Sequence, residues 1–268
     1  MGDTIAASMD IRVASWIELQ ETLFADSYQE RLQRFRSAFV FRGVPRVTHT
    51  LDTSLQTGGF VEHEKHLLTS FRKYAVERSV HGDWIWNWLS LAKHHGLPTR
   101  VLDWTYSPYV ALHFATENFR EFDHDGAIWC VDYRQTNSML PQPLRAMLGG
   151  ESANIFTTEM LMRVATSLDE FDAFGGDFVL FFEPPSLDER IVNQFALFSL
   201  PSSARLSLEE LLKQRDSAWR RIIIPAALKW EVRDKLDQAN ITERVLFPGL
   251  DGLSQWLKRY FTTRNGRV

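Results

Sequence analysis

The sequence has little of several residue types that would mark common classes of protein. Among its 268 residues there is one cysteine, Cys130, so an internal disulfide cannot form. Cys130 lies in the apolar run AIWCVDY, where a cysteine more often serves as a small buried hydrophobe than as a catalytic thiol. A chain without disulfides suits a reducing compartment, and we therefore expect a cytoplasmic protein.

Long apolar runs and an excess of positive charge are also missing. No stretch approaches the roughly 20 apolar residues that a membrane-spanning helix needs, and the N-terminal residues MGDTIAASMD do not have the form of a signal peptide. The formal net charge is −4, so no overall basic field attracts nucleic acid. We expect no membrane contact. The net charge does not exclude a local basic groove.

Several catalytic and metal-binding motifs are absent from the sequence as well. It has no phosphate loop ending in Gly-Lys-Ser/Thr and no Gly-x-Ser-x-Gly elbow, which argues against P-loop NTPases and α/β-hydrolases. Its eight histidines include His63 and His66 at helical spacing, but the zincin pattern and any cysteine cluster are missing. We therefore expect no metal site.

The sequence does contain an irregular mixture of helix and strand patterns. The run AFVFRG, residues 38–43, predicts a buried strand, and residues 191–200 also read as extended. Ser107 followed by Pro108 predicts the start of a helix. The proline-bearing stretch Gln135–Gly150 predicts a loop. Because helices and strands do not alternate regularly, we expect the α+β class, with a mixed sheet and an N-terminal helical part.

No repeat or low-complexity linker divides the chain. We therefore expect one domain over residues 1–268, with a core from about residue 36 to 260. The aromatic helix predicted at Trp84–His95 could offer bases a stacking platform, but its tryptophans alternate with Ile85 and Leu89, which favours core packing.

The densest polar stretch is HHGLPTRVLDWTYSPYVALHFA, from His94 to Ala115. A helix that begins at Ser107 presents free backbone N–H groups, which suit an anion. Just upstream, Arg100 can bind a phosphate or carboxylate through two hydrogen bonds. Asp103 and Thr105 can hold hydroxyl groups such as those of a ribose. This composition predicts a site for a phosphate-bearing ligand.

Arg42 is a second arginine at a strand end. It precedes Gly43, where a ligand could approach the backbone closely. The two arginines, the hydroxyl-binding residues and the helix start together predict a nucleotide site. A purely structural explanation stays open, in which Arg100 and Asp103 form an internal ion pair and the neighbouring threonines are turn and cap residues.

These residues resemble the FRG domain family, which is named for a Phe-Arg-Gly signature. The signature stands here as Phe41-Arg42-Gly43, and the block His94–Ala115 is similar to the most distinctive segment of the family. The resemblance extends to about Leu257. Because FRG domains look like bacterial and phage-associated proteins, it implies a role in conflict between genomes.

Two later motifs also resemble the FRG family. Arg190 and Gln194, in ERIVNQFALF, are similar to its Arg–Gln motif, and LFPGLDG, residues 246–252, is similar to its closing turn. Ala196 and Gly249 depart from the pattern, because we expect glycine and aspartate there.

A second resemblance is to the Arg–Ser–Glu class of ADP-ribosyltransferases, which use NAD. Arg42 is similar to the arginine that binds the NAD phosphates, and Asp103-Trp104-Thr105 takes the place of the Ser-Thr-Ser strand, supported by a helix at Val110–Ala115. This resemblance implies an ADP-ribosyltransferase-like fold with NAD as substrate and no metal. Asp103 and Thr105 would then hold the nicotinamide ribose.

Such enzymes need a carboxylate against the ribose 2′-hydroxyl, to stabilise the positive charge that develops as nicotinamide leaves. The late strand offers only the neutral Gln194, with Glu183 and Glu64 as alternatives. Arg100 would contact phosphate or stiffen its strand, and His95 would hydrogen-bond the ligand. The predicted catalytic residues are Arg42, Thr105, Gln194 and Glu183, and the predicted cofactor-binding residues are Arg42, His95, Arg100, Asp103, Thr105 and Ser107.

Three functional hypotheses follow. The first is an NAD-using enzyme, either an ADP-ribosyltransferase with a protein or nucleic-acid acceptor or an NAD glycohydrolase. The second is a non-catalytic module that binds a nucleotide or a nucleic-acid end. The third is a protein-interaction domain whose polar block is a buried structural network. A glutamate placed beside Arg42 and Thr105 by the fold would favour the enzyme, and its absence would favour the binding module.

Overall fold

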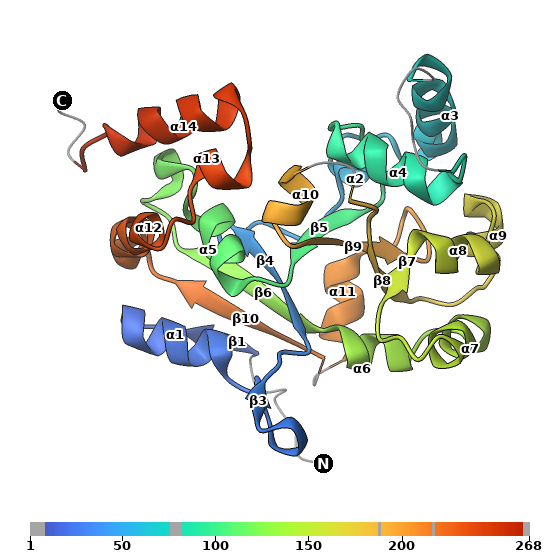
Figure 1. Cartoon of the computed structure of the whole chain (residues 1–268), viewed down its shortest axis with the longest axis horizontal. Helices are drawn as coiled ribbons and strands as arrows, with labels where there is room; N and C mark the ends of the chain where they lie inside the picture. Colours follow the sequence, from blue (N-terminus) through green and yellow to red (C-terminus); the bar gives the residue numbers. More distant parts are fainter. Residues whose placement is uncertain (1–8, 76–81, 187–188, 216–217, 265–268) are drawn as a thin grey trace, which may run out of the picture.

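A mixed sheet runs through the middle of the molecule (Figure 1). The computed structural model describes residues 9–75, 82–186, 189–215 and 218–264. Neighbouring strands are antiparallel except at the two edges, where β1 lies parallel to β10 and β7 lies parallel to β8. In spatial order the strands are β1 (Asp10–Arg12), β10 (Trp219–Ile224), β6 (Gly126–Asp132), β4 (Phe39–Val44), β5 (Leu102–Thr105), β9 (Ala196–Pro201), β8 (Val179–Glu183) and β7 (Phe156–Thr157).

Helices of one to three turns surround this sheet. They are α1 (Trp16–Phe24), α2 (Ser54–Thr57), α3 (Glu64–Tyr74), α4 (Ile85–His94), α5 (Pro108–Thr116), α6 (Tyr133–Ser138), α7 (Gln142–Gly150), α8 (Thr158–Val164), α9 (Leu168–Asp172), α10 (Glu189–Asn193), α11 (Leu208–Lys213), α12 (Lys229–Gln238), α13 (Glu243–Leu246) and α14 (Leu250–Tyr260). A separate hairpin joins β2 (Tyr28–Gln29) to β3 (Arg34–Phe35). Within the ranges described, none of the helices has the length and apolar character needed to cross a membrane.

Alternate residues of β4 pack into different clusters, as the pleat of a strand requires. Phe41 packs with residues of α1, α5 and α12, whereas Val40 and Val44 pack with Trp129 and the leucines of α11. Helices therefore cover both faces of the central strands. The prediction of a mixed sheet with associated helices is confirmed, and residues 10–12 add an edge strand that the predicted N-terminal helical part did not include.

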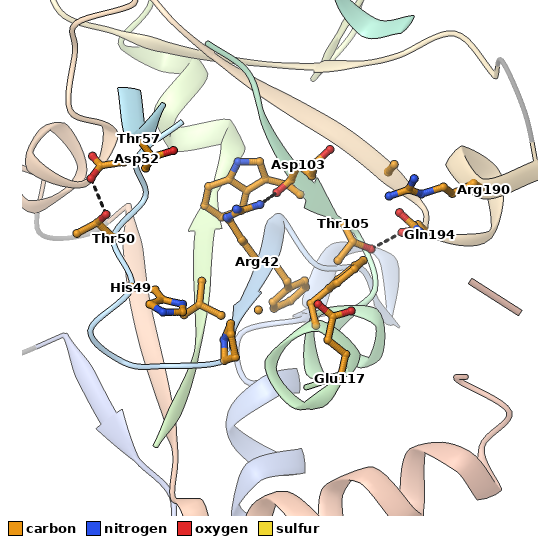
Figure 2. A pocket seen from close by; sticks show the side chains of 17 residues that line it. Arg42, His49, Thr50, Asp52, Thr57, Asp103, Thr105, Glu117, Arg190 and Gln194 are labelled. Carbon is orange, nitrogen blue, oxygen red and sulfur yellow. Dashed lines mark hydrogen bonds between the residues drawn. The ribbon is translucent and has the colours of Figure 1, made fainter. Parts of the chain in front are cut away.

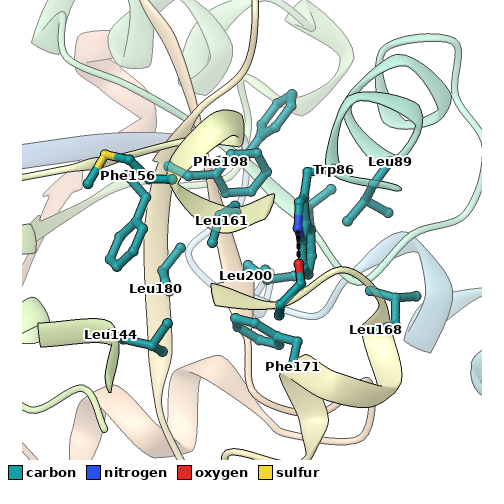
Figure 3. Packing of buried hydrophobic residues seen from close by; sticks show 14 of the residues in the cluster. Trp86, Leu89, Leu144, Phe156, Leu161, Leu168, Phe171, Leu180, Phe198 and Leu200 are labelled. Carbon is teal, nitrogen blue, oxygen red and sulfur yellow. Dashed lines mark hydrogen bonds between the residues drawn. The ribbon is translucent and has the colours of Figure 1, made fainter. Parts of the chain in front are cut away.

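A third cluster joins α4, α7, α8 and α9 to strands β8 and β9 (Figure 3). Trp86 is fully buried there, and its indole N–H donates to the Ala165 carbonyl at 2.8 Å. Phe171 packs edge-on against the Trp86 ring, with 5.5 Å between centroids. Trp86 is therefore a core residue, and its ring is not free to stack on a base.

Local signals predicted several elements correctly. Residues 39–44 form β4, and α5 begins at Pro108 with the Ser107 hydroxyl accepting from the Val110 amide at 3.3 Å. The helical spacing of apolar residues from about Val61 to Arg78 predicts one long helix. The structure has a 3₁₀ turn followed by α3, and the predicted end at Arg78 lies outside the described residues.

Two predictions were wrong. Residues 135–150 are mostly helical rather than a loop, because Pro141 and Pro143 lie at the start of α7, where a missing N–H costs nothing. Residues 191–200 are not extended throughout, because α10 occupies their first part and β9 begins only at Ala196.

Gly43 allows helix α5 to lie directly against β4. A Cβ atom at this position would lie 1.8 Å from the Ala111 carbonyl oxygen and 2.8 Å from the Ala115 nitrogen. Both atoms belong to the helix backbone, so neither can move aside as a side chain would. The space that a side chain at Gly43 would occupy is therefore filled by the backbone of α5, while Gly43 itself also lines a cavity.

We predict that Gly43→Ala lowers the free energy of unfolding by about 3 kcal/mol, because the added methyl group forces α5 away from the sheet. Gly149→Ala is the matched control: it lies in α7 with open space around its missing Cβ, and should be neutral or stabilise by about 0.5–1 kcal/mol. Urea unfolding of both variants measures the difference. Equal stability of the two variants would contradict this account of the packing.

Candidate functional site

Strands β4 and β5 diverge and leave a cavity between them. They are neighbours in the sheet, yet the only registered pair between them is Phe41 with Thr105. β4 instead pairs along its whole length with β6, and β5 does so with β9. The space between the diverging strands belongs to a cavity of about 450 Å³ (Figure 2). Four of the predicted site residues line it, namely Arg42, Asp103, Thr105 and Gln194.

The Arg42 side chain spans the gap between the two strands. Its Nη1 atom donates to the Asp103 carbonyl oxygen at 2.7 Å, which takes the place of a missing ladder hydrogen bond. Its Nε atom is buried and has no hydrogen-bond partner among the described residues. No carboxylate of the described residues lies within 4 Å of the guanidinium. Burial lowers the pKa of Arg42, against the opposing attraction of Asp103. Arg42 is thus a cation, partly removed from water, beside an open cavity.

Asp103 faces the cavity as an ionised carboxylate. Burial by itself would raise the pKa of Asp103, but attraction to Lys93, Arg42 and Arg190 holds it below its ordinary value. Lys93 is the partner in direct contact, at 2.7 Å from the carboxylate. About half of the Asp103 side chain remains exposed, so the carboxylate can still accept hydrogen bonds from a ligand hydroxyl.

The Thr105 hydroxyl is used within the protein. It donates to the Gln194 carbonyl oxygen at 2.7 Å and accepts from the Ser107 amide at 3.0 Å. The side-chain amide of Gln194 donates to the Leu246 carbonyl at 2.9 Å. These bonds fix the wall of the cavity, so Thr105 can offer a ligand only a remaining lone pair and Gln194 only its amide oxygen.

A comparison with protein families bears on this part of the chain. Residues 37–124 match the family model of the FRG domain, a range that contains β4, β5, α5 and the polar block. This chain carries an FRG domain. No curated protein and no solved structure matches it. The further resemblance at Arg190, Gln194 and residues 246–252 lies outside the matched range.

The structure gives each residue of the FRG signature a separate task. Phe41 is buried in the core, Arg42 reaches across the cavity, and Gly43 admits helix α5. Adjacent side chains of a strand point to opposite faces, so Phe41 and Arg42 cannot lie on the same face of β4.

The two later motifs meet each other beside the FRG domain. The Arg190 guanidinium lies 4.8 Å from the centre of the Phe247 ring, and Gln194 is bonded to the backbone of Leu246. Asn193 adds a bond to the Val245 carbonyl at 2.8 Å. Arg190 makes no hydrogen bond or ion pair with any described residue. The second arginine at the cavity is therefore Arg190, which the sequence had placed only in a family motif.

Glu117 is a cavity residue that the sequence analysis missed. It follows the last turn of α5 and lines the same cavity as Arg42 and Thr105, with its carboxylate directed inward (Figure 2). Burial and repulsion from Glu243 raise the pKa of Glu117 to about 7, although Arg233 and Arg190 oppose the shift. The spacing of Glu117 four residues after His113 was the available signal, because such pairs share a helix face. A glutamate therefore lies on the same cavity as Arg42 and Thr105.

Arg100 is part of a buried ion network instead of the cavity wall. The side chain is 2% exposed, and its Nε atom lies 2.8 Å from the Glu64 carboxylate. Asp172 is a second partner of the guanidinium. Glu64, an alternative carboxylate in the sequence analysis, is thus occupied by Arg100. The ion pair expected between Arg100 and Asp103 is absent from the described residues, because each has another partner.

Three other predicted residues lie outside this cavity. Glu183 accepts a hydrogen bond from the Tyr106 hydroxyl at 2.8 Å. Ser107 caps the N-terminus of α5, whereas Phe114 and Glu117, at the opposite end of the helix, face the cavity. His95 lies in an adjoining hollow of about 540 Å³, whose walls share Asp103 and several other residues with the main cavity.

The described residues contain no group of three or more histidine, cysteine, aspartate or glutamate side chains able to hold a metal ion. Cys130 is buried, and burial raises the pKa of its thiol to about 12. A thiol in this environment is not ionised near neutral pH, so it does not supply a nucleophile.

Glu117 should make stability depend on pH. The pKa of Glu117 is about 7 in the folded chain, whereas the ordinary value of 4.5 applies to the unfolded chain. At pH values between these two, the folded chain retains a proton that the unfolded chain has released. The free energy of unfolding therefore falls as the pH rises through this interval. We predict that Glu117→Gln removes this loss, so that the variant gains stability relative to wild type between pH 5 and pH 8.

The gain should be on the order of 1 kcal/mol, since solvent screens a side chain that is 42% exposed. Thermal unfolding at several pH values measures it. Glu21→Gln, at an exposed position of α1, is the matched control. A difference between Glu117→Gln and wild type that does not change with pH would contradict the assignment.

Proposed function

We propose that the cavity between β4 and β5 binds a phosphate-bearing nucleotide, and that NAD is the first ligand to test. The observation that carries the proposal is the environment of Arg42: a guanidinium fixed by a backbone carbonyl, with a buried Nε–H and no carboxylate partner in the described structure. A cation in this position gains most from an anion that enters the cavity, since charge-assisted hydrogen bonds strengthen away from water.

Arg190 supports a ligand with more than one phosphate. It lines the cavity with Arg42 and forms no ion pair with a described residue. The Phe247 ring beneath its guanidinium holds it without neutralising it. Two arginines able to bind phosphate oxygens suit a diphosphate better than a single carboxylate. The cavity volume of about 450 Å³ also falls within the range of roughly 300–1,000 Å³ for small-molecule sites.

The remaining polar groups suit a sugar. The ionised Asp103 carboxylate can accept hydrogen bonds from two ribose hydroxyls, and Thr105 can accept one more. His95, in the adjoining hollow, is available to a ligand that extends past Asp103. Arg100 has no part in this proposal, because its carboxylate partners already satisfy it.

Glu117 favours the enzymatic hypothesis over the binding module. If NAD occupies the cavity, the bond between the ribose C1′ and the nicotinamide nitrogen breaks, and nicotinamide leaves with the bonding electron pair. An acceptor hydroxyl, amine or water then attacks C1′ and loses a proton. The Glu117 carboxylate would stabilise the positive charge on the ribose or take that proton, in the role that the sequence analysis gave to Gln194 or Glu183. A pKa near 7 suits proton transfer at neutral pH.

We predict that Arg42→Gln weakens NAD binding by about ten- to a hundredfold, because it removes a charge-assisted contact to phosphate. Calorimetric titration of NAD into wild type and variant measures the change. Arg145→Gln, at an exposed position of α7, removes the same charge and should bind as wild type does.

ADP-ribose and ATP, titrated in parallel, distinguish a preference for NAD from general recognition of a nucleotide diphosphate. If Arg42→Gln folds and binds all three ligands as wild type does, the assignment of the cavity is wrong.

The catalytic hypothesis makes a separate prediction. Glu117→Gln should reduce the release of nicotinamide from NAD by about a hundredfold or more while changing NAD affinity little, since the carboxylate acts on the reacting ribose. Glu183→Gln is the control and should leave the rate unchanged, because Glu183 does not line the cavity. Wild type that binds NAD and releases no nicotinamide, with or without an added acceptor, would establish the binding module in place of the enzyme.

A further inference from the structure

His113 is buried in α5, four residues before Glu117. Its side chain is completely buried, and its Nδ1 atom lies 2.9 Å from Nη1 of Arg233 in α12. On the other side of the ring, Nε2 lies 3.7 Å from the Glu117 carboxylate. The imidazole therefore stands between an arginine and the glutamate of the candidate site.

Arg233 determines which nitrogen of His113 carries the hydrogen. An arginine donates hydrogen bonds and cannot accept them, so the Nδ1 atom that faces it must offer a lone pair. Burial lowers the pKa of His113 well below its ordinary value, with Arg233 and Arg259 adding repulsion, so the ring is neutral. A neutral imidazole whose Nδ1 is an acceptor has its hydrogen on Nε2.

Arg233 is itself held firmly. It is 1% exposed, and Nη2 donates to the Ile241 carbonyl at 2.5 Å and to Asp237 at 3.1 Å. Arg259, from α14, bonds Asp237 and Glu243 with distances of 2.5–2.7 Å. The tautomer of His113 is thus fixed by helices near the C-terminal end of the chain.

The Nε2–H group is left without a partner. Nε2 is buried and has no hydrogen bond within the described part of the chain, and its distance to Glu117 exceeds the roughly 2.7–3.2 Å of such a bond. Buried donors are rarely left unpaired, so one in this position calls for an explanation. A small shift of the Glu117 side chain would satisfy it.

We propose that His113 is a positioning residue for Glu117: Arg233 fixes its tautomer, and the Nε2–H group orients the Glu117 carboxylate toward the ligand in the cavity. This inference rests on the proposed function, which gives Glu117 its task. It extends that function to two buried residues that no ligand can touch.

The same geometry implies control over the protonation of Glu117. An N–H group directed at a carboxylate favours its ionised form. The other charged groups that face Glu117 are Glu243 from α13, Arg233 from α12 and Arg190 from α10. Arg120, Lys258 and Arg259 share a second hollow with Glu117 on its outer side. Among the described residues, His113 is the one that places a side-chain nitrogen within 4 Å of the Glu117 carboxylate.

Two substitutions of His113 separate the acceptor that faces Arg233 from the donor that faces Glu117. Asn places an oxygen near the position of Nδ1, so His113→Asn keeps an acceptor for Arg233 and removes the donor to Glu117. Gln places an N–H group near the position of Nε2, so His113→Gln keeps the donor. Carbon-13 NMR of the glutamate carboxyl groups, with the Glu117 signal assigned by its loss in Glu117→Gln, gives the Glu117 pKa in each protein.

We expect His113→Asn to raise the measured pKa of Glu117 by roughly half a unit to one unit, and His113→Gln to restore most of the wild-type value. If His113 only fills space, both variants will lose stability and leave that pKa unchanged, which overturns the proposal. The titration needs no ligand, so it remains decisive if the protein does not bind NAD.

Nitrogen-15 NMR of the wild-type protein tests the tautomer without any variant. We expect the Nε2-protonated neutral form of His113 across the neutral pH range. A hydrogen on Nδ1, or a charged ring at pH 7, would overturn the proposal even if both His113 variants failed to fold. In the enzyme assay, His113→Asn should shift the pH dependence of nicotinamide release and lower kcat more than it raises KM, whereas His113→Gln should retain the wild-type profile.

Discussion

Helix α5 can lie against β4 only because Gly43 has no side chain, and most of the candidate site depends on this contact. The contact fixes how close the helix comes to the sheet. Its far end then brings Glu117 to the cavity, and its buried face brings His113 to Arg233. Since Arg42 precedes Gly43, the residue that admits the helix and the residue that faces the cavity cannot move independently.

The candidate site is assembled from three regions of the chain with different tasks. The FRG domain contributes Arg42, Asp103 and Glu117, which are three of the charged residues at the cavity. The segment that follows β8 adds Arg190 and Gln194, and the Gln194 carbonyl accepts a hydrogen bond from Thr105. The C-terminal helices add no charged group to the wall, but Phe247 supports Arg190 and Arg233 supports His113. The charged side chains at the cavity and the residues that hold the site in position thus come from different parts of the sequence.

Local sequence signals predicted several of the elements but only part of the site. An apolar run ended by glycine identified β4, and Ser-Pro identified the start of α5, because both depend on residues next to one another. Arg42, Asp103, Thr105 and Gln194 do line one cavity. Arg100 does not, because its partners Glu64 and Asp172 are distant in sequence and no local pattern indicates them. Glu117 was missed because the direction of its carboxylate depends on how α5 packs.

The strand pairing also limits what the FRG segment can be by itself. Of its two sheet strands, β4 pairs along its length with β6 and β5 pairs with β9, and both partners begin after residue 124. Cut out at the boundaries of the family match, residues 37–124 would expose two unpaired strand edges, and such edges invite aggregation. The segment matched by the FRG family model therefore needs strands from elsewhere in the chain before it can fold.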